Sequence, residues 1–170
     1  MSFPTEPGLG GKTDYGTPPA LYDYLDRLFG FDLDAAAHAG NHKCPVWFGP
    51  DSPSGVYDAL RPALEWNQYG SRIWLNFPYS RIDNARWVER AYHESRRTDT
   101  IVCTLQFLRP ETQWWRNWIS RAETVFLLTP RVQFAGAPSG AQVPSSVAVF
   151  TPWCQGPPTY RTLQWKGDTP

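Results

Sequence analysis

A four-residue turn near the middle of the chain combines groups that could do chemistry on an amine. Asn76 directly follows an apolar run at residues 73–75, and Phe77, Pro78 and Tyr79 complete the turn. The Asn76 side-chain oxygen and the Phe77 backbone carbonyl can both accept hydrogen bonds from an amino group, and rigid placement makes such acceptors effective. Pro78 stiffens the turn, and Tyr79 offers a ring on which a flat base can stack. The alternative is a purely structural turn, because Asn and Pro both favour turns.

Strands and helices alternate around this turn. A strand over residues 72–75 leads into it, a helix runs from Asp83 or Asn84 to about residue 97, and residues 100–108 form an almost entirely apolar strand. This order places the turn at the carboxyl-terminal edge of a sheet, where open α/β folds bind ligands. The other predicted elements are a helix that Thr17 caps and Gly30 ends, strands at 31–35, 46–48, 125–128 and 146–150, a helical turn at 56–60, and a helix over 112–122. The alternation predicts an α/β fold with a largely parallel sheet.

The composition is that of one neutral domain whose basic residues are mostly arginine. The 170 residues include 16 basic and 16 acidic side chains. A net charge of zero excludes a globally basic surface, although arginine suits planar contacts to phosphate and bases. No signal-peptide pattern or membrane-length apolar run occurs, and three cysteines at unrelated spacings predict a reduced, cytoplasmic protein. Residues 1–13 are predicted to form a flexible arm, and residues 153–170 a tail without clear periodicity.

The central turn resembles the Asn-Pro-Pro-Tyr motif of amino-methyltransferases that use S-adenosylmethionine, with Phe77 in place of the first proline. Further segments resemble the small phage-type DNA N6-adenine methyltransferases, in the same order along residues 14–150. These segments are Asp14-x-x-Thr17-Pro18, Leu28 to Ala37, Asn41-x-Lys43-Cys44, Trp87-Val88-Glu89-x-Ala91, Arg109-x-x-Thr112-x-Trp114-Trp115, Arg131-x-x-Phe134 and Ser146 to Phe150.

The resemblance implies a minimal Rossmann-like class I methyltransferase over residues 14–152, with a mostly parallel central sheet flanked by helices. The implied activity is transfer of a methyl group from S-adenosylmethionine to the N6 amino group of adenine in DNA. Adenine N6 is a poor nucleophile because its lone pair is delocalised into the ring. Acceptors at Asn76 and Phe77 would draw the amino hydrogens and free that lone pair, while Tyr79 stacks on a base flipped out of the duplex.

The resemblance also implies a cofactor site. Thr17 and Pro18 would lie near the methionine end of the cofactor, and Asp34 and Ala35 in the first cofactor-binding strand and turn. Asp34 could accept from the amino group or the ribose hydroxyls; the alternative is that it caps the segment that follows. No glycine-rich turn is present, and none is required, because S-adenosylmethionine carries no phosphates.

Two departures from the family pattern both lie where strands end. They are Phe77 for proline, and Gln106-Phe107-Leu108 where a proline-containing strand end is common. We expect them to change the shape of the pocket together. Two alternatives therefore stay open: a catalytically silent relative that binds DNA or a host protein, and an enzyme that methylates another amine such as cytosine N4.

DNA is the expected macromolecular partner, bound by a monomer or weak dimer in the cytoplasm, which is the host cytoplasm if a phage encodes the chain. Arg109 and Arg131 are the predicted DNA contacts, and the loops at 49–71 and 135–144 are the segments available to read sequence. A helix face carries Arg86, Arg90 and Arg97, which either bind phosphate or are simply solvated. The spacing of His38, His42 and Cys44 matches no standard zinc pattern, so we expect no metal.

Overall fold

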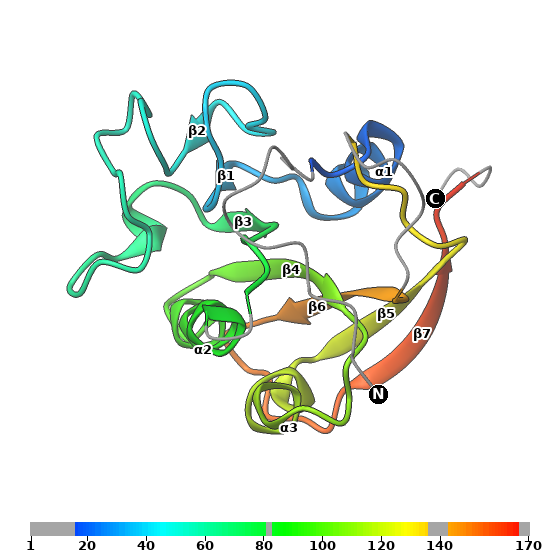
Figure 1. Cartoon of the computed structure of the whole chain (residues 1–170). Helices are drawn as coiled ribbons and strands as arrows, with labels where there is room; N and C mark the ends of the chain where they lie inside the picture. The colour runs from blue at the N-terminus through cyan, green and yellow to red at the C-terminus, as the bar shows by residue number, and fades with distance from the viewer. Residues whose placement is uncertain (1–15, 81–82, 136–142, 167–170) are drawn as a thin grey trace.

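A seven-stranded sheet forms the centre of the computed structural model, which describes residues 16–80, 83–135 and 143–166 (Figure 1). The strand order is β2-β1-β3-β4-β6-β5-β7. Strands β1 to β4 are parallel, β6 is antiparallel to both β4 and β5, and β7 is parallel to β5. Six of the seven strands therefore share one direction, which confirms the predicted α/β fold. The strands are β1 (Leu33–Asp34), β2 (Val46–Trp47), β3 (Arg72–Leu75), β4 (Ile101–Phe107), β5 (Thr124–Thr129), β6 (Ser145–Phe150) and β7 (Thr159–Gln164).

Helices cover both faces of this sheet. Tyr22 of α1 (Pro19–Phe29) meets Trp74 of β3 edge-on at 5.9 Å, and Tyr92 of α2 (Asp83–Ser95) meets Phe150 of β6 at 6.3 Å. In the sheet, Trp74 pairs with Cys103 of β4, whereas Phe150 pairs with Val102, the residue directly before Cys103. Neighbouring strand residues point to opposite faces, so α1 and α2 cover opposite faces. Figure 1 shows α3 (Gln113–Asn117) beside α2, with α1 on the other side of the molecule.

Helix α1 ends as its sequence predicts but begins differently. Gly30 adopts a left-handed conformation with φ 64°, and its N–H donates to Asp26 O at 2.7 Å. The expected cap by Thr17 is wrong: Pro18 occupies the N-cap position, and no side chain caps this end. The Thr17 hydroxyl is bonded elsewhere, to Asn76.

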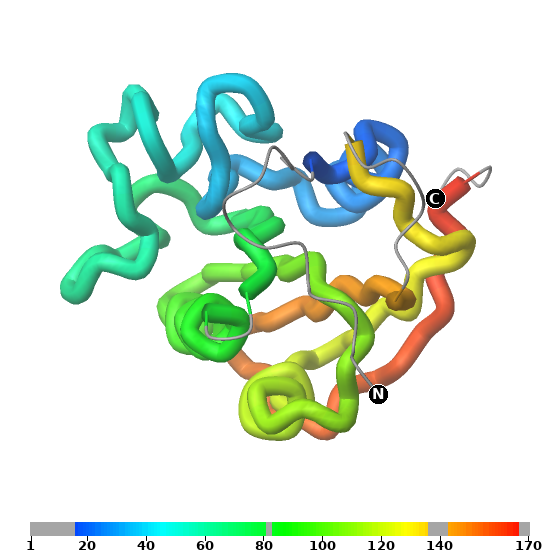
Figure 2. Tube along the Cα trace, viewed as in Figure 1, coloured from blue at the N-terminus to red at the C-terminus, as the bar shows by residue number. Residues whose placement is uncertain are grey.

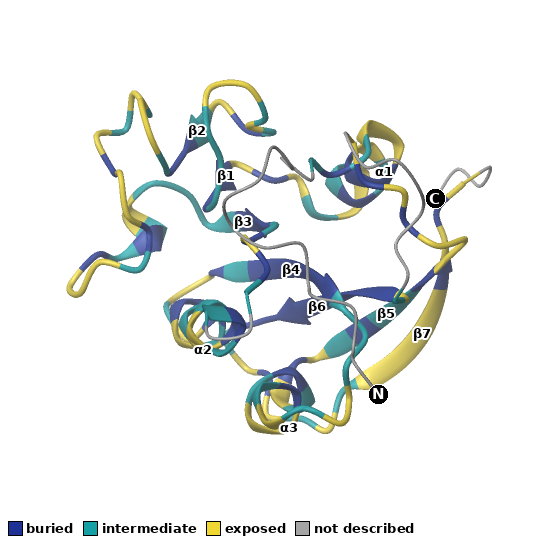
Figure 3. Cartoon of the chain, viewed as in Figure 1, coloured by how far each residue is buried: buried dark blue, intermediate teal, exposed yellow. Residues whose placement is uncertain are grey.

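Three other local expectations differ from the structure. The short helical element of the 49–71 stretch is a 3₁₀ turn, η1 (Trp66–Gln68), and residues 56–60 are not helical. The helix expected over 112–122 is divided into α3 and a second 3₁₀ turn, η2 (Ile119–Arg121). Strand β7 was not expected, because five of its six residues are exposed and show no alternating burial (Figure 3).

Two segments far apart in sequence meet before α1. Gly16 and Ala135 form an isolated antiparallel bridge, with Ala135 N–H donating to Gly16 O at 3.0 Å. Figure 2 shows the chain after β5 running up to the start of α1. This bridge holds Thr17 and Phe134 near the carboxyl-terminal edge of the sheet. No described helix is long and apolar enough to cross a membrane, and the three cysteines are buried and free.

Candidate active site

The predicted site residues follow the carboxyl ends of strands that run in one direction. Asp34 ends β1, Asn76 directly follows β3, and Phe107 ends β4, and these three strands are neighbours in the sheet. Arg109 lies two residues beyond the end of β4, and Arg131 lies two residues beyond the end of β5. The sheet therefore brings four strand ends that carry predicted site residues to one edge.

Hydroxyl groups hold both ends of the Asn76 side-chain amide. Its Nδ2 donates to Thr17 Oγ1 at 3.1 Å, and its Oδ1 accepts from the Tyr79 hydroxyl at 3.0 Å. Asn76 itself is half-buried, whereas Thr17 is only 2% exposed. The amide is consequently fixed at the point where the sheet ends.

Tyr79 lies in the core. Its hydroxyl also donates to Leu105 O at 2.8 Å, and its ring meets Phe77, Phe107 and Phe134 at centroid distances of 5.2, 4.7 and 6.2 Å. Burial raises the pKa of the Tyr79 phenol, so the hydroxyl stays protonated. In this arrangement the ring packs on protein aromatics; its stacking on a flipped base stays a prediction.

The two departures from the family motif meet at Tyr79. The Phe77 ring lies nearly parallel to that of Trp87 on α2, at 6.3 Å and 14°, and edge-on to Tyr79. Phe107 contacts the same Tyr79 ring. Phe77 is 2% exposed, so its ring fills the space between α2 and Tyr79, while Pro78 is exposed at the tip of the turn.

Ser80 joins the turn to α2, a role that sequence reasoning missed. Its Oγ accepts from Asp83 N–H and donates to Asp83 Oδ2, both at 2.8 Å. Its backbone N–H donates to Asn84 Oδ1 at 3.0 Å. This reciprocal pattern resembles a capping box, and the Ser80-x-x-Asp83 spacing is the signal that could have revealed it.

Asp34 is a buried carboxylate that supports the loop after β1. Its two oxygens accept from Ala36 N–H at 3.3 Å and Lys43 N–H at 3.0 Å, and only 3% of the residue is exposed. Burial raises the pKa of Asp34 to about 6, and the two backbone hydrogen bonds oppose that rise. Ala35 is buried, with its N–H bonded to Trp74 O. The side chain thus supports the loop, and the alternative that Asp34 is the N-cap of a following helix is wrong, because no helix follows it.

This carboxylate suits a positively charged ligand. A buried carboxylate whose pKa is raised is incompletely compensated, and a cation placed beside it would favour its charged form. S-adenosylmethionine carries both a sulfonium and an ammonium group. The buried Asp34 carboxylate at this edge therefore fits the cationic cofactor that the sequence resemblance implies.

Arg109 and Arg131 lie at the correct edge for a substrate contact. Arg109 forms a 3.5 Å ion pair with the exposed Glu111, and its buried Nε has no hydrogen-bond partner among the residues that the structure describes. Arg131 is exposed. Their binding to DNA stays a prediction. Much of the predicted 135–144 reading loop, and Asp14, lie outside the described residues.

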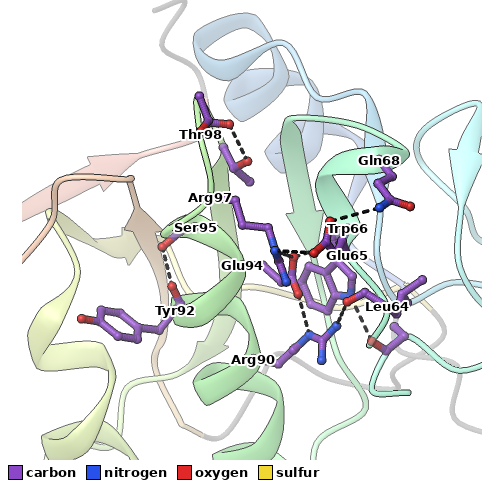
Figure 4. A network of polar contacts seen from close by, with 12 residues as sticks. Leu64, Glu65, Trp66, Gln68, Arg90, Tyr92, Glu94, Ser95, Arg97 and Thr98 are labelled. Carbon is purple, nitrogen blue, oxygen red and sulfur yellow. Dashed lines mark hydrogen bonds and ion pairs between the residues drawn. The ribbon is translucent and has the colours of Figure 1, made fainter. Parts of the chain in front are cut away.

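Arg90 of α2 and Arg97, which lies two residues beyond the end of that helix, form ion pairs rather than a simply solvated face, and phosphate binding by them stays a prediction. Arg90 and Arg97 both pair with Glu94, at 2.9 and 2.8 Å, and Arg97 also pairs with Glu65 at 2.9 Å (Figure 4). Glu94 is 2% exposed and accepts from Trp66 N–H at 3.0 Å. Arg90 also donates to Leu64 O. The network fastens the 49–71 stretch to α2, and the Arg90-x-x-x-Glu94-x-x-Arg97 spacing is the signal that sequence reasoning missed.

The histidine region shows packing rather than a ligand set. His42 stacks on Trp47 at 5.3 Å, and its Nδ1 lies 3.0 Å from Cys44 O. Within the described part of the chain, no three His, Cys, Asp or Glu side chains could together hold a metal ion.

Comparison with known proteins identifies the family of the chain. The model of the family described as DNA N-6-adenine-methyltransferase (Dam) matches residues 11–154. A search of curated proteins found no match. The matched segment contains the Asn76 turn, Asp34 and both predicted DNA-binding arginines. The chain belongs to the Dam family of DNA N6-adenine methyltransferases, enzymes that transfer a methyl group from S-adenosylmethionine to the N6 amino group of adenine in DNA.

Proposed function

We propose that the turn at residues 76–79 is the acceptor site for the adenine amino group in this methyltransferase. The observation that supports the proposal most directly is the fixed amide of Asn76, which follows β3 and is held by Thr17 and Tyr79. Asn76 Oδ1 and the Phe77 carbonyl accept hydrogen bonds from the N6 hydrogens. These acceptors gain strength as the nitrogen becomes cationic, so they stabilise the transition state more than the ground state.

The reaction needs no general base with a tuned pKa in this proposal. The cofactor, when bound, supplies a methyl group on a positively charged sulfur. The N6 lone pair would take the methyl group, S-adenosylhomocysteine would leave, and the N6 proton would be lost to water only after the nitrogen carries a positive charge. The protein residues therefore orient the amine and hold its hydrogens, which is a preorganised electrostatic role.

The cofactor lies beside Asp34 and Ala35 at the end of β1, with Thr17 and Pro18 at its methionine end. The buried carboxylate of Asp34, with its raised pKa, favours the cationic cofactor. DNA approaches the same edge and contacts Arg109 and Arg131. The protein acts as a monomer or weak dimer in a reducing cytoplasm, where its three free cysteines stay as thiols.

Replacing Asn76 with alanine tests the acceptor site. The loss of one transition-state acceptor should lower kcat for labelled methyl transfer into DNA about 10²–10³-fold. Affinity for S-adenosylhomocysteine, measured by calorimetry, should stay nearly unchanged. Asn117→Ala, at an exposed position in α3, is the matched control. Full activity of Asn76→Ala would remove the turn from the mechanism.

A further inference from the structure

We propose that the hydroxyl groups of Thr17 and Tyr79 are positioning groups that set the orientation of the Asn76 amide. This inference rests on the proposed acceptor role of Asn76. It assigns Thr17 a function toward the substrate amine, in addition to its predicted place near the cofactor. It also assigns Tyr79 a function that depends on its hydroxyl rather than on its ring.

The three residues come from separate segments. Thr17 precedes α1 and lies 59 residues from Asn76 in sequence, while Tyr79 belongs to the same turn as Asn76. An amide is planar, so a hydrogen bond at each end fixes both its rotation and its tilt. Only with both fixed does the Asn76 oxygen point constantly toward one place at the sheet edge.

Thr17 is available for this task because it does not cap α1. Pro18 takes the N-cap position, the next residue is a proline without an N–H group, and no side chain caps this end of the helix. The Gly16–Ala135 bridge fixes the backbone directly before Thr17. At 2% exposure its hydroxyl has little contact with water, so the bond to Asn76 Nδ2 satisfies a group that would otherwise be costly to bury.

Tyr79 holds the other end of the amide from within the core. Its hydroxyl has one proton and faces two acceptors, Asn76 Oδ1 at 3.0 Å and Leu105 O at 2.8 Å. The Leu105 carbonyl is part of β4, so the hydroxyl links the amide to the neighbouring strand. Three phenylalanine rings around Tyr79 keep its ring in place. An amide oxygen has two lone pairs, so it can accept from Tyr79 and from a substrate amine together.

Two matched substitutions at Thr17 separate its hydroxyl from its shape. Thr17→Val keeps the volume and removes the hydroxyl, whereas Thr17→Ser keeps the hydroxyl. We expect Thr17→Val to lower kcat about ten- to a hundredfold through misorientation of the amide, with the KM for DNA and the affinity for S-adenosylhomocysteine changed little. Thr17→Ser should restore most of kcat. Equal kcat in the two variants, or a loss of cofactor affinity without a loss of kcat in Thr17→Val, would overturn the inference.

Tyr79→Phe separates positioning from stacking. This variant keeps the ring, so a role in base stacking alone predicts an unchanged kcat. The positioning role predicts a fall of about tenfold that is restricted to kcat. Thermal unfolding of each variant reports the structural cost separately, because a purely structural hydroxyl would lower Tm and leave kcat per folded molecule unchanged.

A double-mutant cycle distinguishes failure of this inference from failure of the proposed function. In the Asn76→Ala background, Thr17→Val and Tyr79→Phe should have no further effect on single-turnover methyl transfer, because the group that they position is gone. Undiminished effects in that background would overturn the inference while leaving Asn76 in the mechanism. Wild-type activity of Asn76→Ala alone would overturn the proposed function itself.

Discussion

The two ends of α2 are fastened by different chemistry. At its amino end, Ser80 joins the helix to the Asn76 turn, and the bonds described around Asn76 come from neutral hydroxyl groups. Toward its carboxyl end, Glu94 forms ion pairs with two arginines and accepts a hydrogen bond from the Trp66 N–H. This charged network holds the 49–71 stretch (Figure 4). Charged groups hold the 49–71 stretch at one end, whereas at the other end the described bonds to Asn76 itself come from neutral hydroxyls, which in the proposed function orient the acceptor amide.

The difference has a physical reason. Charged partners would compete strongly for the Asn76 oxygen or alter its electron density, whereas a neutral hydroxyl leaves the amide able to accept from a substrate. Glu94 has no such constraint, and its burial requires strong partners. The comparison predicts that damage to the network changes stability, and that damage to the turn changes chemistry.

Removal of Glu94 should have the largest effect on stability. Glu94→Ala leaves Arg90, Arg97 and the Trp66 N–H without their shared acceptor, so we expect a loss of about 3–5 kcal/mol in the free energy of unfolding. Urea denaturation measures this loss, and Glu89→Ala on an exposed position of the same helix is the control. The kcat per folded molecule should stay within a factor of two or so. A large fall in kcat with intact stability would break the comparison.

Substitutions of Phe77 test whether the aromatic side chains of the turn stabilise the fold. Phe77→Ala removes a ring buried between Trp87 and Tyr79, and about 3 kcal/mol of stability should be lost. Phe77→Leu should lose less, because it retains most of the buried volume. Methyl transfer into DNA should change only modestly in Phe77→Leu, since the backbone carbonyl remains. If either variant, or Phe77→Pro, transfers methyl groups much faster than the native chain, the ring instead blocks the base pocket.

The Asp34 carboxylate is buried, and its described hydrogen bonds come from two backbone N–H groups. Its pKa is about 6 in the folded chain, above the ordinary value of about 3.9 for an unfolded chain. The folded state therefore holds the proton more tightly. The resulting stabilisation is complete below the unfolded pKa and is lost as pH rises through about 6, a change of roughly 3 kcal/mol.

Denaturation at several pH values measures this change, and Asp34→Asn should abolish the slope between pH 4 and 6. Affinity for S-adenosylmethionine should change in the opposite direction. It should increase as pH rises through about 6, because the charged carboxylate favours the cation. A cofactor affinity that is independent of pH across this range would separate Asp34 from the cofactor site.

The smallest expected effects concern DNA. Arg109→Ala and Arg131→Ala should each reduce the slope of log affinity against log salt by about one unit, as one phosphate contact is lost. Fluorescence anisotropy with duplex DNA measures the slope, and Arg161→Ala on the exposed strand β7 is the control. An equal reduction by the control would place the DNA elsewhere on the surface.

Much of the fold was predictable because local signals were strong. The apolar runs that became β3 and β4, the helix that begins at Asp83 and the end of α1 at Gly30 all follow from periodicity or from one residue's backbone preference. Strand β7 was not predictable in this way. It is an edge strand with little burial, held by main-chain bonds to β5, and such bonds leave no alternating pattern in the side chains.

The sequence by itself determined the residues of the turn, their order and the family to which they point. The tertiary structure alone decided which groups meet Asn76 and Glu94. Thr17 lies 59 residues from Asn76, and Glu65 lies 32 residues from Arg97. Side-chain periodicity reports whether one element is buried, but it carries no information on which distant segment covers it. That choice depends on how the sheet orders its strands, and here the sheet brings a hydroxyl to the amide and a carboxylate to the arginines.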